Sequence, residues 1–376
     1  MPDATIRQCA VLVGGMGTPT PLLQVGDRPF LAWVLREFLR FGIDDFYLLT
    51  GALSDSVQAA LPGIAALLPR PARITVCREP VRAGSGGALH LASDHLAEKF
   101  LLCDGDHWLD FNLSQLLAAA GSDPPEITGR MVLRRAEEPG LGMVSAGLYL
   151  LNRSILNDIP PVCSLERDIL PVLAEKGVLR GTLGEGYFVD IGIPADLARA
   201  QTDLPARLHR RALFLDRDGV INRDHGYVGT KDRFDWMPGA KETIRTATDA
   251  GFHVFVVTNQ AGIARGFYSE TQLTALHDWM ETEIRAAGGT IDDWRFCPYH
   301  PDGIIEPYNQ PHPWRKPAPG MLLDLMAKWE LDPGRCLMIG DQPTDLAAAA
   351  AAGVPAHRFQ GSDLASFALP LLTRVS

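Results

Sequence analysis

Short apolar runs alternate with amphipathic segments along both halves of the chain. In the first half the apolar runs lie at 46–50, 73–77, 99–106 and 143–151, and the segment 30–42 carries apolar residues at helical spacing. Runs of this length are typical of buried strands, and the segments between them have room for helices. We therefore expect the first half to be a layered α/β unit.

The second half shows the same alternation with its own set of elements. Each expected strand ends in a loop that carries polar residues. The expected strands lie within 212–220, 253–260 and 335–342, and the expected helices cover 238–250, 269–287 and 318–330. Both halves are therefore predicted to be Rossmann-like layered domains.

The boundary between the two halves is predicted near residue 205. A chain of 376 residues is longer than one hydrophobic core usually supports. The segment 205–211, PARLHRR, is polar, basic and proline-bearing, and it follows an expected helix at 194–202. We expect domains at 1–204 and 212–376 that are joined by a linker at 205–211.

Composition and charge argue against several classes of function. The formal net charge is −10, which argues against a surface that binds nucleic acid. No apolar run is long enough to span a bilayer, and the amino-terminal segment lacks the pattern of an export signal. We therefore expect a cytoplasmic protein without a membrane partner. The six cysteines are scattered, so we expect no disulfides.

Asp216 and Asp218 stand at the end of the apolar run ALFL, within the sequence ALFLDRDGV. Residues two apart in an extended chain project to the same side, so the two carboxylates are expected to lie close together. Such a pair attracts Mg²⁺, which takes oxygen ligands and keeps waters that a phosphate can replace. One carboxylate can attack phosphorus while the other moves the proton of the leaving group.

Three further segments carry side chains that can bind phosphate or a metal ion beside these two carboxylates. Thr258 and Asn259 follow a buried strand and offer a hydroxyl and amides to phosphate oxygens. Lys316 precedes a helix, where its ammonium can neutralise charge on a transferred phosphoryl group. Asp341 and Asp345 follow another strand and offer a further metal ligand and a carboxylate that keeps the site in order.

In this order, the four segments resemble the haloacid dehalogenase-like (HAD) phosphatases. The resemblance implies a parallel sheet, and no insertion is long enough for a large cap domain. It makes Asp216 the nucleophile and Asp218 the acid and base, and it makes Thr258 and Lys316 the phosphate binders. Mg²⁺ would be held by Asp216, by the backbone carbonyl of Asp218 and by Asp341.

The loops of the second half resemble the D-glycero-D-manno-heptose 1,7-bisphosphate 7-phosphatases. The stretches DRDGVINRDHGYV, VVTNQAGIARG, CPYHP and RKPAPGML carry the likeness. It implies a phosphorylated sugar substrate, with Arg265 and Arg315 on the phosphate that is not cleaved and His225 and Tyr227 in the sugar pocket. Histidinol phosphate or another sugar phosphate stays open as the alternative substrate.

Relatives of both kinds often carry a structural zinc ahead of the RKP motif. The corresponding positions here are Cys297, Tyr299, His312 and Trp314. Only two of these four residues offer a usable ligand, whereas structural zinc requires four donors. We therefore expect no zinc, and we expect aromatic packing and prolines to hold the loop.

The first half resembles the sugar-1-phosphate nucleotidyltransferases. The stretches VLVGGMGT, EPVRAGSGGAL, LLCDGDHWLDFNL, SAGLYLL and GYFVDIGIPADLARAQ carry this likeness. It implies a mixed sheet, a glycine-rich turn around nucleotide phosphates, two aspartates on a metal, and residues that face the base and the sugar. The glycine-rich turn corresponds to Gly14, Gly15 and Gly17, and the two aspartates correspond to Asp106 and Asp190. Gly86 would face the base, and Glu166 would face the sugar.

The catalytic loop of that family is shortened in this chain. The family follows its glycine turn with an arginine and a Pro-Lys-Pro, whereas this chain passes from Thr18 directly to Pro19, Thr20 and Pro21. Nucleotidyl transfer depends on such cations. We therefore expect an inactive or weakened domain that serves as a dimerisation or ligand-sensing module, with a homodimer as one outcome. The alternative is a bifunctional enzyme that also transfers a nucleotidyl group, from GTP, to heptose 1-phosphate.

Overall fold

The chain divides into two compact units, Met1–Pro205 and Ala206–Ser376. The structure, a computed structural model, describes residues 6–14, 20–79, 83–136 and 142–375. Helix α6 (Pro194–Leu208) passes the predicted helix end at 202 and contains Pro205. The ring of Pro205 packs against Gly26, where a Cβ atom would stand 2.7 Å from Cγ of the proline. Only 209–211 of the predicted linker therefore lie outside a helix.

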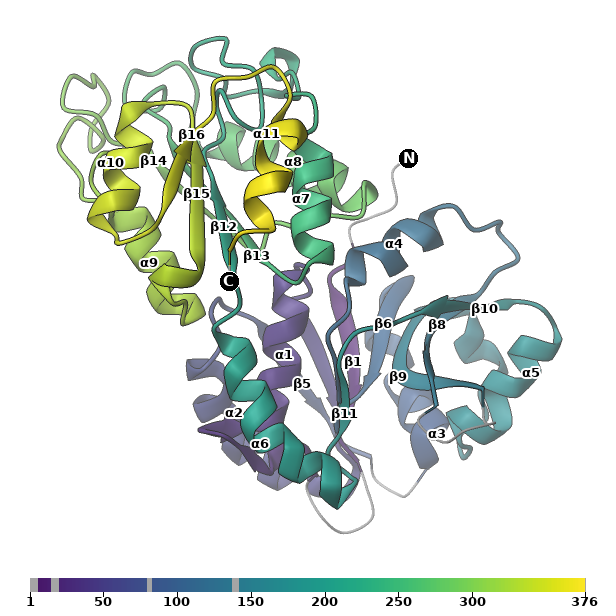
Figure 1. Ribbon diagram of the computed structural model, residues 1–376. Coiled ribbons are helices and arrows are strands. Elements are labelled where there is room, and N and C mark those ends of the chain that lie inside the picture. The colour runs from purple at the N-terminus through teal and green to yellow at the C-terminus, as the bar shows by residue number, and fades with distance from the viewer. Residues whose placement is uncertain (1–5, 15–19, 80–82, 137–141, 376) are drawn as a thin grey trace. The chain divides into compact units, whose positions relative to one another are not determined.

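The first unit is built on a seven-stranded mixed sheet (Figure 1). Its strands, in spatial order, are β10 (Leu179–Leu183), β8 (Gly129–Arg135), β9 (Met143–Asn152), β6 (Lys99–Asp104), β1 (Gln8–Leu12), β4 (Asp45–Leu49) and β5 (Arg73–Cys77). Strand β9 is antiparallel to β6 and β8, and the other pairs are parallel. The mixed sheet predicted for this half is confirmed.

A two-stranded antiparallel ladder positions the candidate metal residues of the first unit. It pairs β7 (His107–Leu109) with β11 (Phe188–Asp190), and its register sets Asp190 opposite His107. Asp106 directly precedes β7. Two aspartates that are distant in the chain therefore meet at one end of this ladder.

Helices α3 and α5 pack on the sheet of the first unit. Leu89 of α3 and Leu170 of α5 are buried in one cluster with Leu102 and Tyr149 of the sheet. Helix α1 buries most of its side chains, as its helical spacing of apolar residues predicts. The helices besides α6 are α1 (Phe30–Arg40), α2 (Ser54–Ala66), α3 (Gly84–Leu91), α4 (Leu113–Gly121) and α5 (Leu170–Glu175).

The second unit is built on a five-stranded parallel sheet. Its strands, in spatial order, are β14 (Asp293–Cys297), β13 (His253–Asn259), β12 (Ala212–Leu215), β15 (Cys336–Gly340) and β16 (Ala356–Arg358). All four neighbouring pairs run parallel. The parallel sheet predicted for this half is confirmed.

Helices cover both faces of this parallel sheet (Figure 1). Leu213 and Leu215 of β12 pack in one buried cluster with α7 (Ala240–Asp249), α8 (Glu270–Ala286) and α11 (Leu364–Leu372). Ala212 and Phe214 of the same strand pack in another with α9 (Gly320–Trp329) and α10 (Pro343–Ala351). Alternate residues of a strand face opposite sides of the sheet, and both sides are covered by helices here. The run ALFL is therefore apolar throughout.

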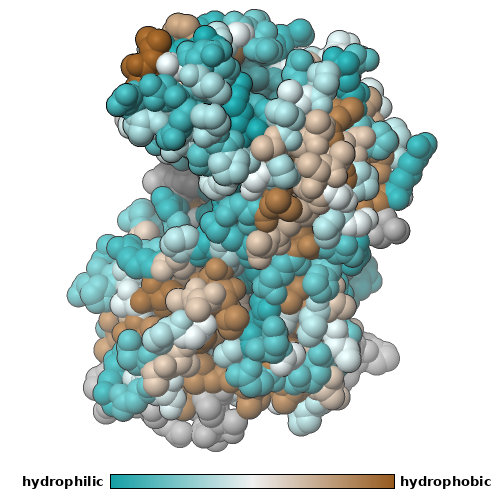
Figure 2. Space-filling model, turned by 90° about the vertical axis from the view of Figure 1, so that its left-hand side faces the viewer, coloured by the Kyte–Doolittle hydropathy of each residue, from teal (hydrophilic) through white to brown (hydrophobic). Residues whose placement is uncertain are grey.

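Three further expectations concern a cap domain, the cysteines and membrane-spanning helices. In the described part of the second unit, loops, short turns and the helices named above connect the strands, as expected for a fold without a large cap. All six cysteines are free thiols, as predicted. No helix among the described residues is long and apolar enough to cross a bilayer. The face displayed in Figure 2 mixes hydrophilic and hydrophobic residues.

Candidate active site

The ends of three adjacent strands bring the predicted catalytic residues of the second unit together. Strand β12 lies between β13 and β15. Asp216 follows β12, Thr258 lies near the end of β13, and Asp341 follows β15. In a parallel sheet these carboxyl ends share one edge, which is where ligands of open α/β sheets bind.

A buried ion pair between Asp216 and Lys316 forms the centre of this site. Their exposed fractions are 7 % and 2 %. Nζ of Lys316 lies 2.9 Å from Oδ1 of Asp216 and 2.6 Å from Oδ1 of Asp345, and it donates to the carbonyl oxygen of Val257 at 2.8 Å. The three donors of the ammonium therefore have acceptors, which fixes its position. Oδ1 of Asp216 also accepts from the N–H of Arg217 at 2.7 Å.

The charges of this cluster act on one another. Burial alone lowers the pKa of Lys316, but the facing carboxylates of Asp216 and Asp345 outweigh burial and raise that pKa above its ordinary value. Burial raises the pKa of Asp216, and the charge of Lys316 opposes part of that rise. Lys316 is therefore held as an ammonium ion, and it favours the ionised form of Asp216.

Three carboxylates form a group that can hold a divalent cation. Oxygen atoms of Asp216, Asp341 and Asp345 lie within 4.8 Å of one another. Oδ1 of Asp341 is buried with no hydrogen-bond partner among the described residues, and a Cβ atom on Gly219 would stand 2.5 Å from Oδ2 of that carboxylate. A buried oxygen without a donor is costly unless a cation pairs with it. These residues therefore fit a hard ion such as Mg²⁺.

This group differs from the predicted ligand set in one residue. Asp216 and Asp341 belong to it as predicted, and Asp345, predicted as a supporting residue, is the third member. Oδ1 of Asp345 faces Lys316, and its Oδ2 accepts from the N–H of Gln342 at 2.9 Å. Both oxygens of Asp345 are thus engaged within the protein. The backbone carbonyl of Asp218 stays a predicted ligand.

The side chain of Asp218 is held by three residues that the sequence analysis missed. Nη2 of Arg217 donates to both carboxylate oxygens, at 2.8 and 2.9 Å. Nδ2 of Asn222 donates to Oδ1 at 2.9 Å, and Nε2 of Gln260 donates to Oδ2 at 2.8 Å. A signal was available for two of them, because Arg217 separates the two predicted aspartates and Gln260 follows the predicted Thr-Asn pair.

Thr258 and Asn259 have different surroundings at the end of β13. Oγ1 of the buried Thr258 accepts from Nε2 of Gln260 at 2.9 Å. The side-chain amide of Asn259 donates to the carbonyl oxygen of Lys316 and accepts from its N–H, both at 3.0 Å. The Asn259 side chain thus binds the backbone of Lys316, and its contact with phosphate stays a prediction.

The two arginines predicted to bind a second phosphate interact electrostatically. Burial lowers the pKa of Arg315, and the charge of Arg265 lowers it further. Nε of Arg265 is buried with no hydrogen-bond partner among the described residues, and Nη1 of Arg315 donates to the carbonyl oxygen of Tyr299 at 3.3 Å. A buried guanidinium nitrogen without a partner, as in Arg265, favours an anion beside it.

An exposed aromatic pair includes the predicted pocket residue Tyr227. Its ring centroid lies 4.7 Å from that of Phe267, and the two residues are 43 % and 60 % exposed. Tyr227 has a φ of 53°, a left-handed conformation that is rare outside glycine. The sequence analysis did not select Phe267. In the same loop, Nε2 of the exposed His225 lies 2.7 Å from Oδ2 of Asp235.

Aromatic contacts hold the loop that follows Cys297, as predicted. The rings of Tyr299 and His312 are stacked with centroids 4.2 Å apart, and Trp314 contacts His312 edge-on at 5.9 Å. Nδ1 of His312 accepts from the N–H of Trp314 at 3.1 Å. Two of the four positions that correspond to zinc ligands are thus packed face to face.

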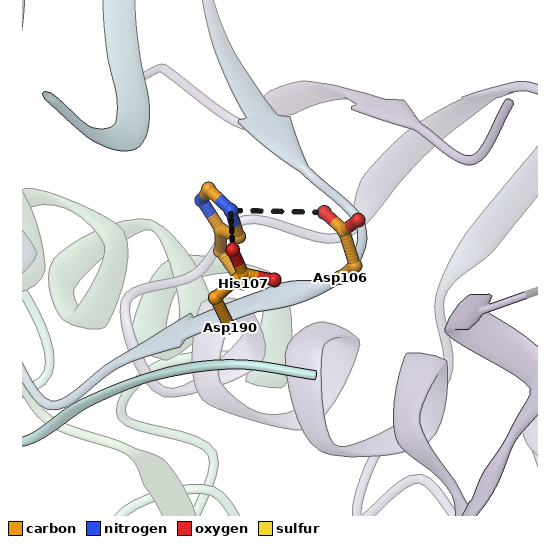
Figure 3. Close-up of side chains that lie close together, drawn as sticks. All are labelled: Asp106, His107 and Asp190. Atoms are coloured by element: carbon orange, nitrogen blue, oxygen red, sulfur yellow. Dashed lines mark ion pairs between the residues drawn. The ribbon is translucent and has the colours of Figure 1, made fainter. Parts of the chain in front are cut away.

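In the first unit, a histidine contacts both predicted metal-holding aspartates (Figure 3). Nε2 of His107 is 3.9 Å from Oδ1 of Asp106 and 3.4 Å from Oδ2 of Asp190, and its Nδ1 is 3.4 Å from Oδ2 of Asp104. Burial alone lowers the pKa of His107, but the surrounding carboxylates raise it to about 9. An imidazolium therefore balances part of the negative charge of Asp106 and Asp190.

The other predicted nucleotidyltransferase positions are only partly described. Oε2 of Glu166 accepts from the hydroxyls of Ser85 and Ser164 at 2.7 and 2.9 Å. Gly86 is buried, and a Cβ atom there would stand 2.4 Å from Sγ of Cys163, so packing alone requires glycine. Gly14 is exposed just after β1. Gly15 and Gly17 lie outside the described residues.

A match to a known family falls on the part of the chain that contains the Asp216–Lys316 pair. A family model for haloacid dehalogenase-like hydrolases matches residues 189–353. A D-glycero-beta-D-manno-heptose-1,7-bisphosphate 7-phosphatase from Rhodopseudomonas palustris is 49 % identical over 163 residues, which are 43 % of this chain and 91 % of the relative. The chain belongs to the haloacid dehalogenase-like hydrolases. As a member, it is a phosphoric monoester hydrolase, and Asp216, Asp218, Lys316 and Asp341 all lie within the matched residues.

Two solved structures are similar to parts of this hydrolase. A D,D-heptose 1,7-bisphosphate phosphatase from B. bronchiseptica, complexed with magnesium and phosphate, is 32 % identical with a TM-score of 0.39, and the match covers 43 % of this chain and 99 % of that one. HddC from Yersinia pseudotuberculosis is 21 % identical with a TM-score of 0.46, and the match covers 53 % of this chain and 99 % of that one.

Proposed function

We propose that the second unit removes the 7-phosphate of D-glycero-D-manno-heptose 1,7-bisphosphate by way of an aspartyl-phosphate on Asp216. The observation that carries this proposal is the buried contact, at 2.9 Å, between Nζ of Lys316 and the carboxylate of Asp216. A carboxylate held beside a fixed cation is prepared to attack an anionic phosphoryl group, because the cation opposes the charge that gathers there.

The two aspartates divide the reaction between them. Oδ2 of Asp216 attacks phosphorus, since the contacts from Lys316 and Arg217 fall on Oδ1. The bond from phosphorus to the sugar oxygen breaks, and Asp218 gives its proton to that oxygen. Asp218 then takes a proton from water as the water attacks phosphorus, which releases inorganic phosphate and restores Asp216.

Neighbouring groups balance the charge of the phosphoryl group. Nζ of Lys316 supplies a positive charge next to the attacking carboxylate. Gln260 already donates to Oγ1 of Thr258, so the proton of the Thr258 hydroxyl is left for a phosphoryl oxygen. Bound Mg²⁺, held by Asp216, Asp341 and the carbonyl of Asp218, would neutralise further phosphoryl charge.

The choice of a sugar bisphosphate is supported by a second cationic group and by the relatives. Arg265 and Arg315 interact electrostatically and can hold a phosphate that is not cleaved. Tyr227 and Phe267 offer exposed rings to the sugar, and His225 lies in the same loop as Tyr227. A relative named for heptose 1,7-bisphosphate is 49 % identical. Histidinol phosphate has one phosphate, so it would leave the arginine pair unused.

Phosphate release from a panel of substrates tests the assignment. The panel holds both anomers of heptose 1,7-bisphosphate, fructose 1,6-bisphosphate, histidinol phosphate and p-nitrophenyl phosphate. We expect kcat/KM to be highest for one heptose anomer. Arg265→Gln is expected to lower kcat/KM for that substrate by roughly 10- to 100-fold, the cost of one lost charged hydrogen bond or two, with a much smaller loss on p-nitrophenyl phosphate.

Arg245→Gln is the matched control for this series, because Arg245 is exposed on α7. Its kinetics should match those of the unaltered protein on every substrate. Equal or better turnover of histidinol phosphate would overturn the heptose assignment and leave the chemistry of Asp216 intact. If Arg265→Gln lowered kcat/KM equally for all five substrates, the proposed second phosphate site would be wrong.

We propose that the first unit is a ligand-sensing or dimerisation module. The support is the missing arginine and lysine of the catalytic loop, together with the contacts of His107 with Asp106 and Asp190. We expect no pyrophosphate release when GTP, ATP or CTP is mixed with heptose 1-phosphate. A coupled pyrophosphate assay checks this, and release from GTP would establish the bifunctional alternative.

We also propose that the hydrolase works in the cytoplasm with Mg²⁺ and without a structural zinc. Six free cysteines support a reducing compartment. The stacking of Tyr299 on His312 supports a loop held by packing instead of by metal. Stoichiometric zinc in the purified protein would contradict the second part of this proposal.

A further inference from the structure

Arg217 is a buried charged side chain that the reaction described above does not use. It is 0 % exposed and lies between Asp216 and Asp218 in the chain. Its backbone N–H donates to Asp216 while its guanidinium turns to Asp218. Burying a guanidinium is costly unless its donors are paired, so the groups that it contacts indicate what it does.

The guanidinium of Arg217 has further partners besides Asp218. Nη2 donates to the carbonyl oxygen of Val228, and Nη1 lies 3.3 Å from Nε2 of His277. Burial and the charge of Arg217 hold the pKa of His277 well below its ordinary value. His277 is therefore neutral and can accept this hydrogen bond, and its ring is stacked on Trp294 with centroids 4.5 Å apart.

A second support of Asp218 is held as firmly. Nε2 of Gln260 donates to Asp218, and Oε1 of Gln260 accepts from the hydroxyl of Tyr268 at 2.6 Å. The ring of Tyr268 lies against Gly229 and Gly262, where added Cβ atoms would stand 2.1 and 2.3 Å from it. The groups around Asp218 thus form a packed network of hydrogen bonds.

We propose that Arg217 is a positioning residue that holds the carboxylate of Asp218 in the orientation from which it exchanges a proton with the leaving oxygen and then with water. Nε of Arg217 donates to Oδ1 at 3.3 Å and Nη2 donates to Oδ2 at 2.9 Å, and a two-pronged contact of this kind fixes the rotation of a carboxylate. The Asp218 side chain is 20 % exposed and would otherwise rotate toward solvent. This inference rests on the proposed phosphatase function.

A double-mutant cycle tests whether Arg217 acts through Asp218. The variants are Arg217→Gln, Asp218→Asn and the two combined, and the readouts are kcat and KM for the best substrate of the panel. We expect Arg217→Gln to lower kcat by roughly 10- to 100-fold, since misplacing a catalytic group by about 1 Å costs on that order, with little change in KM. The kcat of the double variant should equal the kcat of Asp218→Asn, because the two residues act as a unit.

Two further variants separate positioning from folding. Arg217→Lys keeps the buried charge and should recover part of kcat, and it carries the test if Arg217→Gln does not fold. Arg295→Gln is the matched control, because Arg295 pairs with Asp293 and Asp324 at 2.9 and 2.6 Å elsewhere in the unit. It should lower the thermal midpoint and leave kcat unchanged.

The possible outcomes are distinct. A folded Arg217→Gln protein with normal kcat overturns the inference, and so does a double variant whose loss is the product of the two single losses. In either case the unaltered protein would still release phosphate, so the proposed function would stand. Absence of phosphate release from the unaltered protein, with any substrate of the panel, would overturn the function and the inference together.

Discussion

Replacing Asp216 by asparagine is expected to lower phosphate release by at least about 10⁴-fold, because the amide is no nucleophile and no aspartyl-phosphate can form. The substitution keeps the size of the side chain and its contacts with Lys316 and Arg217. Stopped-time phosphate assays with the heptose bisphosphate measure the loss, and trapping of a phosphorylated protein in acid should succeed only with the unaltered chain.

Asp278→Asn is the matched control for this variant. Asp278 is exposed on α8, so the same chemical change there should leave the rate as it was. Circular dichroism checks that both variants are folded. A rate for Asp216→Asn within tenfold of the original would exclude the aspartyl-phosphate route.

Replacing Lys316 by methionine is expected to lower both activity and stability. The change leaves the buried carboxylates of Asp216 and Asp345 without their cation. Breaking a buried pair in this way costs about 3 to 5 kcal/mol of unfolding free energy, and loss of the charge beside the phosphoryl group should lower kcat by roughly 10²- to 10³-fold. Urea denaturation and phosphate release measure the two effects.

The pH dependence of the Lys316→Met protein follows from Asp216. Its folded pKa is already raised by burial, and loss of the ammonium raises it further. A raised pKa means that folding favours the protonated carboxyl, so stability is gained as pH falls toward the ordinary value of 3.8 and lost as pH rises through the folded pKa. The stability deficit of the variant should therefore shrink as pH falls toward about 7, the folded pKa of Asp216 in the unaltered protein.

Lys328→Met provides the comparison for this second prediction. Nζ of Lys328 lies 3.6 Å from Asp324, and its side chain is 49 % exposed, so its loss should cost less than about 1 kcal/mol. An equally small effect of Lys316→Met would mean that the ion pair at the centre of the site contributes little to the fold. If Lys316→Met kept its phosphatase activity, Lys316 would have no part in the chemical reaction.

The main elements of the second unit were predictable from sequence because their signals are local. The alternation of apolar runs and amphipathic segments placed β12, β13 and β15, and a parallel arrangement brings their ends to one edge. The placement of Asp216 directly after β12 follows from the apolar run that precedes it. The end of α6 was not predictable in this way, since Pro205 continues the helix by packing against Gly26.

The partners of the site residues were much less predictable. Asn259 carries the amide expected for phosphate binding, but the position of Lys316 decides that the amide binds backbone. Arg217 could have been read as a solvated loop charge, and its burial depends on His277 from α8. His107 was passed over because its neighbour Asp190 reaches it only through the pairing of β7 with β11.

The sequence by itself determined the two α/β units, the strands β12, β13 and β15 of the second unit and the identity of the chemical groups at the ends of those strands. Only the tertiary structure decided which groups face one another, and with that which charges are paired, which are buried without a partner and which carboxylate is held in place. The reason is physical: hydrophobic periodicity is set by neighbours along the chain, whereas hydrogen bonds and ion pairs depend on distances of a few ångströms between distant segments.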